Sequence, residues 1–167
     1  MPAYYKATFL KFLADDVSRI VGVLSERAAI EGHTLQHNRQ TEAWRLTLDL
    51  LKAVVQDLVH ESPLAAEWGL LVEYPIPRRQ KRIDVVILAH SLVFCIEFKT
   101  GIGDHKVDSE RQVEHYALDL RDFHAESAGR VIVPVAVTLN GRSAELGQVE
   151  RTNLVRSVVR ANQEDLA

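Results

Sequence analysis

The chain has 167 residues, of which 47% are hydrophobic and 26% are charged, and its formal net charge is −3. This length accommodates one domain with its own core, and the composition is that of a soluble globular protein. The mild negative charge gives no overall sign of a nucleic-acid or membrane binder, so any contact with a polyanion must be local.

The cysteine content and the opening residues bear on the cellular compartment. The only cysteine, Cys95, lies within an apolar run, which leaves no internal disulfide and fits a reducing environment. The opening stretch lacks a basic region followed by a long apolar one, and no run approaches ~18 apolar residues. We therefore expect a cytoplasmic protein without a signal peptide or transmembrane helix.

Helical periodicity dominates the first third of the chain. A helix is predicted over 15–30, with Asp15 or Asp16 placed to cap it, and the polar stretch 31–40 is predicted to be a connector. A second helix over 42–60 has the strongest periodic signal. Its apolar stripe is Trp44, Leu48, Leu51, Val55 and Leu58.

Strand character begins near residue 67. The stretch 67–77 is predicted to contain a strand, a pair of strands over 83–89 and 92–99 follows, and the two glycines of 100–106 indicate a loop. The remaining predicted elements are a helix over 108–124, a strand over 130–139 and a final helix over 147–162. This order predicts an α/β fold with a mixed four-stranded sheet flanked by helices.

Charged residues stand at the outer end of the predicted strand pair. If the hairpin is symmetric about His90 and Ser91, antiparallel partners have numbers that sum to 181, and Asp84 then lies opposite Glu97. Directly opposite side chains lie ~5 Å apart on the same face. Lys99 is two residues beyond Glu97, so strand periodicity places it on that face as well.

Two carboxylates this close repel each other, and burying them unpaired costs several kcal/mol each by general estimates. A divalent cation between them removes the problem, and hard oxygen ligands suit Mg²⁺ or Mn²⁺. The alternative is that Asp84 and Glu97 are surface charges near a sheet edge, with Lys99 neutralising one of them.

At these residues the sequence resembles the PD-(D/E)xK nuclease superfamily, whose core has the order αβββαβ. The resemblance is carried by Asp84 in "RIDVVIL" and by Glu97, Phe98 and Lys99 in "CIEFKTG", and "QVEHY" (112–116) has the Q-x-x-x-Y form of RecB-type members. Ile83 takes the place of the usual proline. Nearly the whole chain is similar to the N-terminal nuclease-like domain of bacterial proteins that continue into a DNA/RNA helicase domain.

The resemblance implies a single restriction-endonuclease-like domain. Its parts would be an N-terminal helical extension over 1–40, a core over 41–140 and a C-terminal helix over 141–167. It also implies Mg²⁺ (or Mn²⁺) held by Asp84 and Glu97, with the backbone carbonyl of Phe98, and Lys99 assisting the attacking water. Four further acids are candidates to complete the metal site: Glu42, Asp49, Glu67 and Glu73.

Substrate contacts are predicted on two segments. By resemblance, Gln112 and Tyr116, which share a helix face, would steady the active site or the substrate backbone. The basic stretch "RRQKR" would contact phosphates through Arg78, Arg79 and Arg82, unless it is simply a solvated loop.

The expected function is metal-dependent hydrolysis of DNA phosphodiester bonds. DNA, or RNA, is the expected partner, together with a helicase domain or protein. The alternatives are a catalytically inactive nucleic-acid-binding or docking module that keeps the fold, and a relative of a larger helicase protein that is active only with that partner.

Overall fold

The structure is a computed structural model, and it describes residues 3–32, 37–76, 81–99, 106–127, 129–138 and 154–162. Within these residues one six-stranded sheet has its strands in chain order. The first four strands pair antiparallel, and the last two continue the sheet in parallel. The strands are β1 Tyr5–Thr8, β2 Gly69–Pro75, β3 Arg82–Ala89, β4 Leu92–Lys99, β5 Val131–Thr138 and β6 Val159–Ala161.

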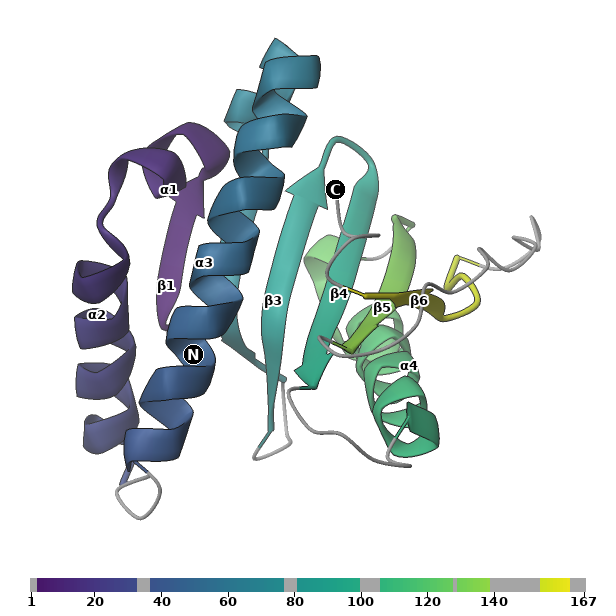
Figure 1. The fold of residues 1–167 in the computed structure, drawn as a ribbon. Helices are drawn as coiled ribbons and strands as arrows, with labels where there is room; N and C mark the ends of the chain where they lie inside the picture. The colour runs from purple at the N-terminus through teal and green to yellow at the C-terminus, as the bar shows by residue number, and fades with distance from the viewer. Residues whose placement is uncertain are drawn as a thin grey trace.

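Helices cover both faces of the sheet (Figure 1). Side chains of the helices that precede β2 join one core cluster, and side chains of the helix between β4 and β5 join a second cluster. The sheet therefore has apolar residues on both faces, as in other α/β folds. The helices are α1 Phe9–Ala14, α2 Val17–Ile30, α3 His37–Glu61 and α4 Lys106–Phe123, with 3₁₀ turns at Pro63–Glu67 and Ala125–Ser127.

The predicted helical stripe of α3 is confirmed. Trp44, Leu48, Leu51 and Val55 are buried in the first core, and Leu58 packs against it while partly buried. These residues recur at intervals of three and four, so one face of a 3.6-residue helix meets the sheet.

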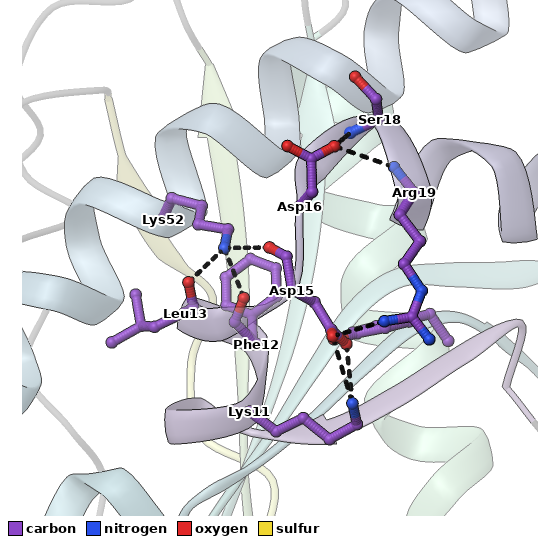
Figure 2. A network of polar contacts seen from close by, with 9 residues as sticks. Lys11, Phe12, Leu13, Asp15, Asp16, Ser18, Arg19 and Lys52 are labelled. Atoms are coloured by element: carbon purple, nitrogen blue, oxygen red, sulfur yellow. Dashed lines mark hydrogen bonds and ion pairs between the residues drawn. The ribbon is translucent and has the colours of Figure 1, made fainter.

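Lys52, on another side of α3, ties that helix to the end of α1 (Figure 2). Its ammonium donates to the backbone carbonyls of Phe12, Leu13 and Asp15 at 2.6, 2.8 and 2.5 Å. These carbonyls belong to the last turn of α1 and the residue that ends it, where no further helical N–H follows. Asp16 then caps α2, since its carboxylate accepts from the backbone N–H groups of Ser18 and Arg19.

The hairpin register predicted from the sequence is confirmed for its central part. The ladder between β3 and β4 runs from Ala89 opposite Leu92 to Val85 opposite Ile96. The predicted helix over 108–124 and the predicted strand over 130–139 correspond to α4 and β5 with ends shifted by one or two residues.

Three expectations need correction. The sheet has six strands among the described residues instead of four, because β1 adds to the free edge of β2 and β6 adds to β5. The N-terminal extension therefore contains a strand as well as helices. The helix predicted over 147–162 is wrong for 154–162, where Val155 bridges to Ile132 and β6 follows.

The C-terminal error has a physical cause. Val155, Val158 and Val159 are three and four residues apart, which is the spacing of a helical stripe. In the structure Val155 and Val158 instead reach the α4 side of the sheet, and Val159 reaches the opposite core.

Among the described helices, none has the length and apolar character that crossing a bilayer requires.

Candidate functional site

The site begins where the hairpin ladder stops. Val85 and Ile96 are its last backbone pair, and at the next position the Oδ2 atom of Asp84 accepts the backbone N–H of Phe98 at 2.8 Å. A side-chain carboxylate thus takes the place of a backbone carbonyl at the end of the ladder. The predicted partner of Asp84, Glu97, lies beside this contact in the sequence of β4.

Glu97 is buried, with 3% of its surface exposed. Its Oε1 atom accepts from the Nε2 atom of Gln112 at 2.6 Å and from the Nζ atom of Lys99 at 3.1 Å. Its Oε2 atom is also buried and has no hydrogen-bond partner among the described residues. A buried carboxylate oxygen without a partner is costly, so it marks a place where a cation or a donor would be stabilising.

Helix α4 contributes the two polar residues that the sequence singled out. The Nε2 atom of Gln112 donates both to Glu97 and to the hydroxyl oxygen of Tyr116, the second contact at 2.7 Å. Gln112 and Tyr116 lie one turn apart, so both face the sheet. Lys99 is 38% exposed at its side chain and reaches solvent from the same strand end. The structure therefore brings Glu97, Lys99, Gln112 and Tyr116 together.

Burial controls the electrostatics of the two carboxylates. It raises the pKa of Asp84, while the N–H of Phe98 and the charge of Lys99 act in the opposite direction. It also raises the pKa of Glu97, and the nearby charge of Asp84 raises it further. The two groups interact closely enough that ionising one disfavours ionising the other.

Glu73 is the only one of the four open acidic candidates that is buried. Pairs of β2 and β3 residues on either side of it, Val72 with Val85 and Tyr74 with Ile83, place it opposite Asp84. Its backbone has a φ of 53°, unusual for a residue other than glycine. The other three candidates are exposed: Glu42, Asp49 and Glu67.

The Glu73 carboxylate is held by α3, since the indole Nε1 of Trp44 donates to its Oε1 atom at 2.7 Å. Burial raises the pKa of Glu73 to about 7, and the charge of Asp84 adds to the increase. The negative charge of Asp84 thus raises the pKa of both neighbouring carboxyl groups, those of Glu73 and Glu97. The sequence signal for Glu73 was a lone acid within the apolar run "LLVEYPI", and the β2–β3 register would have singled it out.

The donor set bears on metal binding. Within the described part of the chain, no three His, Cys, Asp or Glu side chains are grouped so that they could hold a metal ion. Mg²⁺ needs fewer protein ligands, because it is usually held by one or two carboxylates together with water and substrate phosphates. Asp84 and the unpartnered Oε2 of Glu97 fit that requirement. That the backbone carbonyl of Phe98 binds the metal stays a prediction, since Phe98 contacts Asp84 through its backbone N–H.

The basic residues predicted to contact phosphates divide into two groups. Arg78 and Arg79 lie outside the described residues. The guanidinium of Arg82 pairs with Glu31 at the end of α2 and lies over the ring of Tyr4, 4.5 Å from its centroid. Its side chain is 17% exposed. Arg82 therefore links α2, β3 and the N-terminal segment, and a phosphate contact would have to compete with Glu31.

Comparisons with protein-family models, with curated proteins and with solved structures each find no match to this chain.

Proposed function

We propose that the chain is a metal-dependent nuclease domain of the PD-(D/E)xK type that hydrolyses DNA phosphodiester bonds. The observation that carries the proposal is the carboxylate pair of the half-buried Asp84 and the buried Glu97, with Lys99 beside it. One oxygen of Glu97 lacks a partner among the described residues. The mixed sheet with helices on both faces is compatible with a restriction-endonuclease-like core.

Each residue then has a chemical task. Asp84 and Glu97 would hold Mg²⁺ or Mn²⁺, which when bound supplies Lewis-acid activation of the scissile phosphate and of water. The ammonium of Lys99 would orient the attacking water or help to deprotonate it, and would balance the charge of the anionic transition state. Gln112 fixes one oxygen of Glu97, and Tyr116 fixes Gln112.

The test is cleavage of single- and double-stranded DNA with Mg²⁺ or Mn²⁺ by the full chain and by two variants, Asp84→Asn and Lys99→Ala. Both variants keep a side chain of similar or smaller size, so loss of activity with retained folding indicates a lost chemical group. Asp57→Asn and Lys6→Ala are matched controls, because both residues are exposed and lie outside the site. Wild-type cleavage no faster than that of the two site variants would exclude catalysis.

A second candidate function is a nucleic-acid-binding or docking module without catalysis. It is favoured by the absence, within the described residues, of a third side chain grouped with the carboxylate pair for metal binding. DNA or RNA binding that weakens with salt, without cleavage at any metal concentration, would support this second function over the first.

A further inference from the structure

The ladder between β2 and β3 is interrupted at the level of Glu73 and Asp84. Along a regular strand, alternate residues stay on one face of the sheet. Here the backbone pair on one side of the interruption packs in the core cluster of α3, and the pair on the other side packs in that of α4: Val72 with Val85, and Tyr74 with Ile83. Both strands therefore exchange faces at the level of the two acids.

This exchange gives the two carboxylates different partners. The Oε1 atom of Glu73 accepts from the indole Nε1 of Trp44 at 2.7 Å, whereas the Oδ2 atom of Asp84 accepts from the backbone N–H of Phe98 at 2.8 Å. Trp44 and Glu73 are both buried, so little water competes for their contact. The indole thus fixes how Glu73 is oriented.

The charge of Glu73 is felt at the carboxylate pair. Burial raises the pKa of Glu97, and the charges of Asp84 and Glu73 raise it further, against the effect of Lys99. Burial is also the main cause of the raised pKa of Glu73; the charge of Asp84 adds to it and that of Arg82 opposes it. The three acids therefore repel one another, and a cation would relieve this repulsion.

Glu73 is not placed as a third ligand, because no such group of three side chains is found within the described part of the chain. Its burial still costs stability whenever it is ionised without a cation nearby. An independent sign that a cation belongs to this cluster is the buried Oε2 atom of Glu97, which has no partner among the described residues.

We propose that Glu73 strengthens the binding of a divalent cation at Asp84 and Glu97 through its charge, without coordinating the ion, and that Trp44 is its positioning residue. The proposal rests on the proposed function, because it concerns the same site. Coulomb interactions stay substantial over such distances inside a protein. A purely structural role would not need the charge, since glutamine fills the same space and accepts the same hydrogen bond.

The experiment titrates the full chain with Mn²⁺ alone and follows the free ion by electron paramagnetic resonance. At about pH 8 the Glu73 carboxylate is mostly ionised, since burial raises its pKa to about 7. Glu73→Gln is expected to weaken Mn²⁺ binding about tenfold, the order expected for one unit charge acting through the protein interior. Glu61→Gln, exposed at the other end of α3 from Trp44, is the matched control and should bind like the wild type.

A double-mutant cycle tests the role of Trp44. Trp44→Phe keeps an aromatic ring in the core but removes the indole N–H, so it should weaken Mn²⁺ binding in the wild type and have no effect in Glu73→Gln. Trp68→Phe is the matched control, because the Trp68 indole N–H has no partner among the described residues. Equal weakening by Trp44→Phe in both backgrounds would show that Trp44 acts through packing alone.

Failure of this proposal is distinguishable from failure of the proposed function. If Asp84→Asn loses Mn²⁺ binding while Glu73→Gln binds like the wild type, the role of Glu73 is wrong and the metal site stands. If Glu73→Gln binds more weakly as expected but the wild type does not cleave DNA, the role of Glu73 stands and the nuclease assignment is wrong. If the wild type does not bind Mn²⁺, both are wrong.

Discussion

Replacing Glu73 with glutamine tests how much the buried carboxylate of β2 costs the fold. The glutamine has the same shape, and its amide oxygen can accept the 2.7 Å hydrogen bond that the Trp44 indole donates to Glu73. The substitution therefore removes the ionisable group while it keeps the packing and the hydrogen bond. Any change in stability then reports on the charge.

The size of the effect follows from the pKa of Glu73, which burial raises from 4.5 to about 7. Between these two values the folded protein binds the proton and the unfolded chain releases it. The stability associated with the protonated group is thus fully present below about pH 4.5 and is lost as the pH rises to about 7. Each pKa unit corresponds to about 1.4 kcal/mol, so the wild type should lose about 2.5 kcal/mol through Glu73 between about pH 5 and pH 8.

Urea unfolding of the wild type and of Glu73→Gln, with a chelator and at about pH 5 and pH 8, measures this loss. We expect the free energy of unfolding of the variant, relative to that of the wild type, to be about 2.5 kcal/mol higher at about pH 8 than at about pH 5, because the variant lacks the titrating group. Glu67→Gln, at an exposed position shortly before β2, is the matched control and should behave like the wild type. Identical pH dependence in wild type and Glu73→Gln would refute the assignment of a raised pKa to this carboxylate.

Three further substitutions or reactions test the scaffold. Lys52→Met removes the ammonium that donates to three carbonyls at the end of α1, and urea unfolding should show that the free energy of unfolding falls by about 3 kcal/mol. A fall of less than about 0.5 kcal/mol would contradict a stabilising role for these hydrogen bonds. Asp16→Ala removes the N-cap of α2 and should cost about 1 kcal/mol in the same assay, whereas the exposed Asp57→Ala in α3 should cost little. Burial raises the pKa of Cys95 to about 12, so a thiol reagent near neutral pH should label it only as urea unfolds the chain; rapid labelling of the folded protein would contradict its burial.

Elements with a strong local pattern were predictable from the sequence. The stripe from Trp44 to Val55 needs only helical periodicity, and α3 buries it as expected. The register of β3 and β4 needs only a two-residue turn between two apolar runs, and it is confirmed from Val85 to Ala89. In both cases the relevant contacts are set by residues close together along the chain.

Part of the candidate site could be placed in the same way. The proximity of Lys99 to Glu97 follows from the two-residue repeat of a strand, and the shared face of Gln112 and Tyr116 follows from the helical turn. That Gln112 actually reaches Glu97 depends on how α4 crosses the sheet, which no local pattern contains. The chemical roles of these residues stay predictions.

The sequence by itself determined where most helices and strands form, the pairing of the central hairpin, and the gathering of Glu97 and Lys99 at its outer end. Only the tertiary structure decided that β1 and β6 widen the sheet, that Glu73 is buried opposite Asp84, and that Arg160 of β6 lies level with Glu97 of β4, two strands away. The reason is physical, because periodicity is fixed within a few residues, whereas strand neighbours and burial depend on the packing of segments far apart in the chain.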